Sequence, residues 1–152
     1  MEVFALTPQG LLAWAQRKNL RLLENKELGQ LALPRPQDPN QALRFIPRPE
    51  RNLLTLALPL LFTVPQDRIP AFCVALSLAN SATFAGSWTL NHARGEPYFR
   101  ITVPTVGTGY TDQSLDFLVG VVFSSGDRVG PNLMKIALEG ADPKTVLDPP
   151  AA

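Results

Sequence analysis

The sequence predicts an α+β domain in which an antiparallel sheet packs against helices, in the order α-β-β-(β)-α-β-β-α. Segments with the apolar period of a helix alternate with segments that have the period of a strand. Residues 87–103 contain two strand-like runs with clean apolar–polar alternation, which is typical of antiparallel strands with one buried face. A chain of 152 residues, 45% of them hydrophobic, is also long enough to bury its own core.

The first half predicts one helix followed by strands. Thr7 can cap a helix that ends near Asn19, and a proline follows at the first helical position, where it is well tolerated. Residues 20–25 can form a short strand, the proline-rich stretch after them predicts a loop, and 42–47 alternate like a second strand. The apolar run 53–64 predicts a central strand, although its proline indicates a bulge or an edge.

The second half predicts two long helices around a hairpin. Asp67 can cap a helix over 65–80 that is apolar on most of its sides, and Gly95 suits the turn between the strands of 87–103. Thr111 can cap a third helix, in which Gly120 indicates a close approach to a neighbour.

The stretch 124–131 interrupts this helical pattern, and 132–140 predict a short last helix closed by a glycine. We expect one domain over residues 1–140 and a flexible C-terminal tail over 141–152.

Composition and charge narrow the class of protein. The net charge of +1 gives no argument for direct binding of nucleic acid, and a single cysteine cannot form an internal disulfide. The N-terminus has no basic region before an apolar core, and the longest apolar run is too short to span a membrane. We therefore expect a cytoplasmic protein with no membrane contact and no cofactor.

The residues that could carry catalysis do not form a set. His92 and Ser87 are five residues apart on a predicted strand, so they point to opposite faces, about 16 Å apart. Cys73 lies in an apolar helix stripe, and one histidine with one cysteine cannot supply the usual zinc ligands. Asp112 and Asp116 are one helical turn apart, which suits either a divalent ion or a solvated face. We predict no catalytic residue, no metal site and no enzyme.

Two further features allow binding. The stretch "VGTGY", residues 106–110, precedes a helix start and could hold an anion or a nucleotide, although it lacks the third glycine of a dinucleotide fingerprint. Four arginines surround the proline-rich stretch and are either solvating residues or candidates for contact with a polyanion: Arg35, Arg44, Arg48 and Arg51.

The second and third helices each carry two apolar faces, and only one of these can pack on the sheet. A symmetric dimer is the commonest cover for the other face, and a third layer from the first or last helix is the alternative. The candidate dimer residues of the third helix are Phe117, Leu118, Val121 and Val122.

The second half of the chain resembles the YbjN-domain family of bacterial proteins. The resemblance covers residues 53–140, and the Pro- and Arg-rich stretch 34–51 departs from it. The matching features are Val64-Pro65 at the helix entry, Asn80 at its exit, Gly86 before a strand, Phe99-Arg100, and the "TDQSL" helix start. The resemblance implies a fold similar to type III secretion chaperones, often dimeric, with a non-enzymatic role in binding proteins, often linked to stress responses. It implies no catalytic residues.

Together these observations favour a homodimeric protein-binding module, chaperone-like or regulatory. A small-molecule or nucleotide sensor acting through "VGTGY" is the alternative, and a nucleic-acid-associated accessory protein is a weaker one.

Overall fold

The structure is a computed structural model that describes residues 2–107 and 109–149. Its main element is a six-stranded antiparallel sheet with the strand order β2-β3-β4-β5-β7-β6. The strands are β2 Leu23–Asn25, β3 Gln30–Pro34, β4 Ala42–Arg48, β5 Leu53–Pro59, β6 Ser87–Asn91 and β7 Glu96–Pro104. The α-helices are α1 Pro8–Arg17, α2 Ile69–Ser81 and α3 Asp112–Leu138. The predicted class, an antiparallel sheet packed against helices, is confirmed.

Shorter elements complete the fold. A two-stranded sheet pairs β1, Val3–Phe4, with β8, Tyr110–Thr111, and so ties the N-terminal segment to the entry of α3. The described residues also form single-turn 3-10 helices, which are η1 Pro49–Arg51, η2 Gln66–Arg68 and η3 Pro143–Thr145. None of the helices in the described ranges combines the length and the apolarity that a membrane crossing requires.

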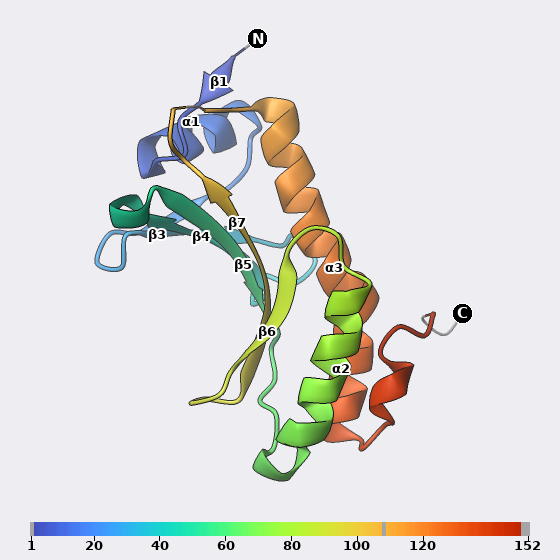
Figure 1. Cartoon of the computed structure of the whole chain (residues 1–152). Helices are drawn as coiled ribbons and strands as arrows, with labels where there is room; N and C mark the ends of the chain where they lie inside the picture. Colours follow the sequence, from blue (N-terminus) through green and yellow to red (C-terminus); the bar gives the residue numbers. More distant parts are fainter. Residues whose placement is uncertain (1, 108, 150–152) are drawn as a thin grey trace.

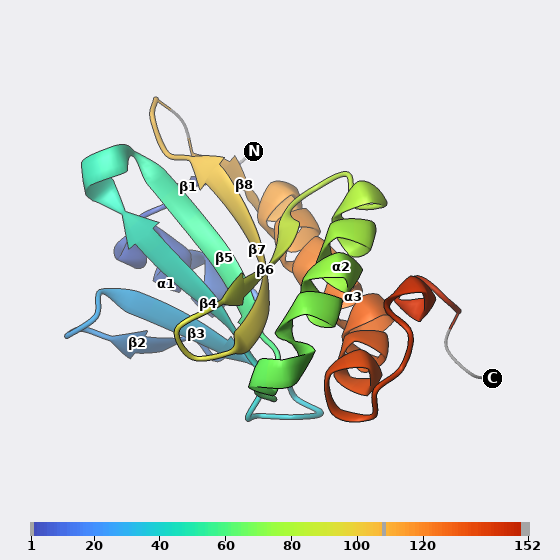
Figure 2. The same cartoon turned by 60° about the horizontal axis from the view of Figure 1, so that its bottom comes forward.

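The core lies between one face of the sheet and the helices. Leu56 and Leu58 of β5 are fully buried, and Trp14 of α1 meets the ring edge of Phe45 of β4, with 6.2 Å between ring centres. Figures 1 and 2 show α2 and α3 side by side along the sheet. The side chains that alternate with these core residues point to the other, open face of the sheet.

The N-terminal half confirms most of the predicted elements. Thr7 caps α1 by accepting a hydrogen bond from the Gly10 N–H, and Asn19 follows the helix in the left-handed conformation, with φ of 56°. The run 53–64 yields the central strand β5, which ends at Pro59 because proline has no N–H for the ladder. Strand β3 was not predicted, because its alternation covers only a few residues before a proline-rich loop and it forms by pairing with β4.

The predicted cap of α2 is wrong. Asp67 lies in η2, and α2 begins at Ile69 without a side-chain cap. Arg68 at this position turns instead to the end of α3, where its Nε and Nη2 donate to the Ile136 carbonyl at 3.1 and 2.8 Å. These bonds satisfy a C-terminal carbonyl of α3 and fix the start of α2 against it.

The hairpin of β6 and β7 forms as predicted, with Gly95 at a φ of 68°. The exit of α2 is joined to β6 by Asn80, whose side-chain amide donates to the Trp88 carbonyl at 3.0 Å and accepts from the Trp88 N–H at 2.6 Å. Since β6 is an edge strand, this amide takes the place of a neighbouring strand at Trp88. Gly86, with a φ of 81°, allows the turn to pass against Phe99.

The predicted break after the third helix is wrong, because α3 runs without interruption to Leu138 and contains Pro131. The small residues that suggested a turn form the packing face of α3. Gly126 is buried against Leu58 of β5, and Gly130 is buried against Leu60, which follows β5. The close approach therefore lies there and not at Gly120, where an added Cβ would meet nothing within 4 Å.

Part of the segment assigned to the tail packs on the helices. Val146 is 1% exposed, and the Asn132 side chain donates to the carbonyls of Val146 and Asp148 at 3.0 and 2.9 Å. The apolar Val146 side chain explains this position, because its burial removes it from water. Residues 150–152 lie outside the described residues, and the boundary at 140 stays a prediction.

Candidate functional site

A groove of about 650 Å³ lies between the end of α1, the segment after β3 and the outer side of α3. We call it the α1–α3 groove. Its lining is Trp14, Lys18, Asn19, Leu20, Arg21, Leu33, Pro34, Arg35, Pro36, Pro39, Asp116, Val119, Gly120 and Phe123. More than half of these residues are apolar or proline, so the groove offers an apolar surface within a charged rim.

Helical spacing builds one wall of the groove. Asp116, Gly120, Phe123 and Asp127 follow each other at intervals of three or four residues, so they lie on one face of α3. Asp116 and Asp127 are eleven residues apart, which is about 16 Å along a helix. Asp116 accepts a hydrogen bond from Lys18 and Asp127 accepts hydrogen bonds from Arg35, so a salt bridge connects the two walls at each end of the groove.

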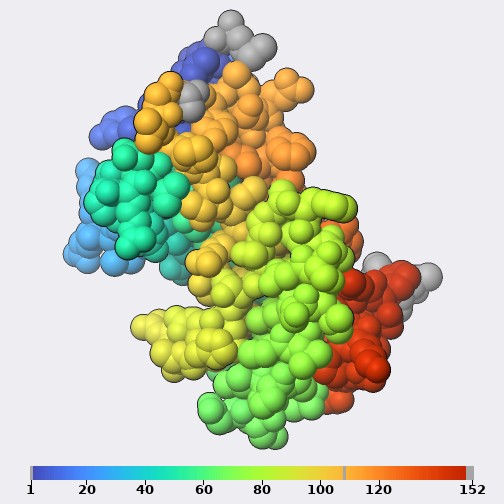
Figure 3. Space-filling model, viewed as in Figure 1, coloured from blue at the N-terminus to red at the C-terminus, as the bar shows by residue number. Residues whose placement is uncertain are grey.

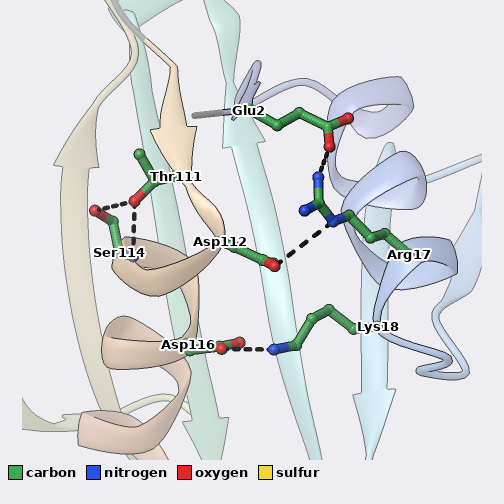
Figure 4. Close-up of polar contacts among 7 residues, drawn as sticks. All are labelled: Glu2, Arg17, Lys18, Thr111, Asp112, Ser114 and Asp116. Atoms are coloured by element: carbon green, nitrogen blue, oxygen red, sulfur yellow. Dashed lines mark hydrogen bonds and ion pairs between the residues drawn. The ribbon is translucent and has the colours of Figure 1, made fainter.

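The first end is closed by ion pairs between α1 and α3 (Figure 4). Lys18 Nζ lies 2.7 Å from Asp116 Oδ2, and this hydrogen bond raises the pKa of Lys18. Arg17 pairs with Glu2 and lies 3.8 Å from Asp112 Oδ2, measured from its Nε. Solvent screens such exposed pairs, so each contributes little to stability, but together they fix how α1 lies on α3.

The second end is closed by Arg35, which follows β3. Its Nη1 and Nη2 donate to the two carboxylate oxygens of Asp127 at 2.6 and 2.8 Å, and its guanidinium lies 4.5 Å from the centre of the Phe123 ring. The hydrogen bonds from Arg35 lower the pKa of Asp127 and raise the pKa of Arg35. Gln41 Oε1 also accepts from Nη1 at 3.1 Å, which anchors the proline-rich loop to α3.

The floor of the groove is apolar and open. Trp14 is fully buried there, and its indole Nε1 has no hydrogen-bond partner within the described residues. Gly120 leaves free space above α3, because an added Cβ would have no atom within 4 Å. The groove can therefore accept apolar side chains without moving the elements that line it.

The predicted dimer residues separate into two sets. Leu118 is 7% exposed and Val122 is fully buried, so both belong to the core of the chain and cannot line a surface between copies. The prediction fails for these two because they face the sheet. Phe117 is 66% exposed and Val121 is half-buried one turn later, so these two lie together on the outer side of α3.

The four predicted polyanion residues do not form one patch either. Arg35 is engaged with Asp127 in the groove, whereas Arg44 and Arg48 of β4 and Arg51 of η1 belong to the open side of the sheet. A residue that the sequence did not single out, Arg100 of β7, lies on that side too and lines the same hollow as Arg48 and Arg51. The alternation within β7 marks Arg100 as outward-facing, but its neighbours follow only from the strand register.

The other candidates stay apart from each other. Ser87 opens β6, and His92 is exposed in the turn after that strand. Cys73 is half-buried in α2. Asp112 and Asp116 are turned to Arg17 and Lys18, and no cluster of three metal-binding side chains occurs among the described residues.

Within the stretch 106–110, residue 108 lies outside the described residues, so the predicted anion site falls partly on it. Tyr110, the last residue of the stretch, pairs with Phe4 in the small sheet.

Comparison with known proteins identifies a matching family and similar solved structures. Residues 8–134 match the model of the YbjN family, described as "putative bacterial sensory transduction regulator". No curated protein matches the sequence. Among solved structures, the chain is similar to YbjN from E. coli, described as "a putative transcription regulator", with 13% identity, a TM-score of 0.64, and coverage of 90% of this chain and 93% of that chain.

Chains from two solved complexes, the first of them described as a chaperone–effector complex, are also similar. A chain of the HopA1–SchA chaperone–effector complex is similar with 15% identity and a TM-score of 0.53, and the match covers 74% of this chain and 83% of that chain. A chain of the ExsC–ExsE complex has 16% identity and a TM-score of 0.54, with 74% and 81% covered. These comparisons confirm the predicted family resemblance and the chaperone-like fold.

Proposed function

Because the chain belongs to the YbjN family, we propose that it is a regulatory protein-binding module, without enzymatic chemistry, that holds an apolar segment of a partner protein in the α1–α3 groove. The observation that carries the proposal is the groove itself, which is apolar, open at Gly120 and braced at both ends by ion pairs. The chaperone-like neighbours, solved as complexes with protein partners, support a protein as the occupant.

The size of the groove suits a short segment. Its volume of about 650 Å³ lies within the ~300–1,000 Å³ that is usual for binding sites. Burial of one large apolar side chain contributes roughly 1.5–3 kcal/mol, so two or three anchors contribute roughly 3–9 kcal/mol before the cost of association is subtracted. The braced walls also reduce the entropy lost on binding.

We extend the proposal to a homodimer in the cytoplasm, acting in bacterial regulation such as a stress response. Phe117 and Val121 carry the dimer part, because they form an apolar strip on the outer side of α3. Sedimentation at micromolar concentration tests it. We expect a dimer that Val121→Glu dissociates and that Gln113→Glu, an exposed change on the same helix, leaves intact. A wild-type monomer would overturn the dimer.

The groove is tested by filling it. Gly120→Leu places a side chain into the free space, and Ser124→Leu places the same side chain one turn later, outside the lining. Peptides selected from a displayed random library on the wild-type protein are then measured by fluorescence anisotropy against both variants.

We expect the selected peptides to share apolar positions, to bind Gly120→Leu at least tenfold more weakly than wild type, and to bind Ser124→Leu within twofold of wild type. Equal binding to wild type and Gly120→Leu, or a library without binders, would contradict the proposal. Urea midpoints no lower than that of wild type show that both variants are folded; replacing the helical glycine should itself raise the midpoint of Gly120→Leu.

A further inference from the structure

The open face of the sheet carries a hollow of about 730 Å³, separate from the α1–α3 groove. Its lining is Arg48, Glu50, Arg51, Leu53, Thr55, Gly86, Ser87, Arg100, Ile101 and Thr102. Figure 3 shows the surface where η1 (teal) meets β7 (yellow-orange). Three guanidinium groups thus share this hollow with a single carboxylate, although the chain as a whole has a net charge of only +1.

The strand register adds Arg44, which lies on the same face of the sheet beside the hollow, to these arginines. Arg44, Ala57 and Arg100 lie in one row across β4, β5 and β7, so two guanidinium stems are two strands apart, about 10 Å, with a small residue between them. Arg48 follows Arg44 by four residues along β4, which is about 13 Å on the same face. Arg51 adds a fourth positive charge at the end of this strand, in η1.

These arginines lack internal partners. The ion pairs among the described residues use Arg17, Lys18 and Arg35, and no side chain of the described chain is hydrogen-bonded to Arg48 or Arg100. The surface between them consists of short polar side chains: the hydroxyls of Thr55 and Thr102 lie 2.9 Å apart and hydrogen-bond to each other. The arginine side chains are therefore free to bind an external anion.

We propose that this face binds an extended acidic segment of a protein, at a site distinct from the apolar groove. Guanidinium groups bind carboxylates through paired hydrogen bonds, and carboxylates four residues apart on an extended chain have about the spacing of Arg44 and Arg48. The lining of the hollow contains no aromatic side chain on which bases could stack, and the net charge is low, so a protein segment is favoured over a nucleic acid.

A labelled peptide of alternating Glu and Ser tests the proposal by fluorescence anisotropy at about 50 and 300 mM salt, a range over which exposed charge contacts are screened. The variant is Arg48→Gln with Arg100→Gln. The control is Arg94→Gln with Arg128→Gln, which removes the same charge from exposed positions elsewhere. We expect the variant to bind at least fivefold more weakly than wild type, the control to bind within twofold of wild type, and binding to weaken at high salt.

Three outcomes would overturn the proposal. Equal loss in both double variants would indicate attraction by net charge alone. Absence of binding below millimolar peptide would remove the site. Equal or tighter binding of a single-stranded oligonucleotide of the same charge, lost in Arg48→Gln with Arg100→Gln, would assign the face to nucleic acid. Gly120→Leu should leave peptide binding unchanged, so a failure here is distinct from a failure of the groove.

Discussion

Gly126 and Gly120 lie in the same helix, α3, and should respond in opposite ways to an added methyl group. A Cβ at Gly126 would lie 2.6 Å from Cδ2 of Leu58, a fully buried side chain of β5, whereas a Cβ at Gly120 would meet nothing within 4 Å. We therefore expect Gly126→Ala to be less stable than Gly120→Ala, and Gly120→Ala to be more stable than wild type.

The magnitude follows from two contributions. Replacing a helical glycine by alanine stabilises the helix by up to about 1 kcal/mol at either position. At Gly126 the methyl group also overpacks the core, which costs about 1–3 kcal/mol because Leu58 has to leave its rotamer. The helix contribution is common to both variants, so their difference in the free energy of unfolding, about 1–3 kcal/mol, reports the overpacking. Each kcal/mol corresponds to about 2–4 °C in Tm for a chain of this size.

Urea unfolding followed by circular dichroism measures this difference, provided that the m-values agree. Shortening the neighbour supplies the control: in a Leu58→Ala background the clash is absent, and Gly126→Ala should then gain the same helix contribution as Gly120→Ala. Equal stability of the two single variants in the Leu58 background would refute the reasoning, because α3 would not approach β5 at Gly126.

Three further changes test other contacts. Asn80→Ala leaves the Trp88 N–H and carbonyl at the edge of β6 without their side-chain partner, so we expect a loss of about 1–3 kcal/mol in urea unfolding, and a loss under 0.5 kcal/mol would contradict it. Thr111→Ala removes the cap of α3 at a cost of about 0.5–2 kcal/mol, whereas Thr111→Ser should retain most of the stability. Asp127 has a folded pKa below its ordinary value of 3.8, because Arg35 donates to it. Its contribution is therefore present above about pH 4 and lost as the pH falls through the folded pKa. Because 61% of the Asp127 side chain is exposed, solvent screens the pair. On acidification we expect wild type to lose more free energy of unfolding than Asp127→Asn, by under about 1 kcal/mol. Identical dependence of stability on pH in the two proteins would contradict the pairing.

The candidate groove could be found only in part from the sequence. Helical spacing already places Asp116, Gly120 and Phe123 on one face of a helix, but their partners come from α1 and from the segment after β3. In the sequence Arg35 is one of several arginines in a proline-rich loop, and nothing within 34–39 indicates that it pairs with Asp127. Such contacts join residues about ninety positions apart, so they depend on how the sheet and the helices pack.

Local patterns determined much of the architecture. Thr7 and Thr111 cap their helices because a hydroxyl and nearby N–H groups are all that a cap requires, and the alternation within 87–103 set two strands with one buried face. Tertiary packing decided the rest. In the sequence alone Gly126 and Gly130 indicate a break in the helix, whereas in the structure they allow the helix to pack closely on β5. Leu118 and Val122 lie on an apolar helix face, and only the structure shows that this face belongs to the core and not to a dimer surface. The strand register, which brings Arg100 beside Arg48, is likewise fixed by long-range pairing, because a sequence pattern states which face a side chain takes and not which neighbours share that face.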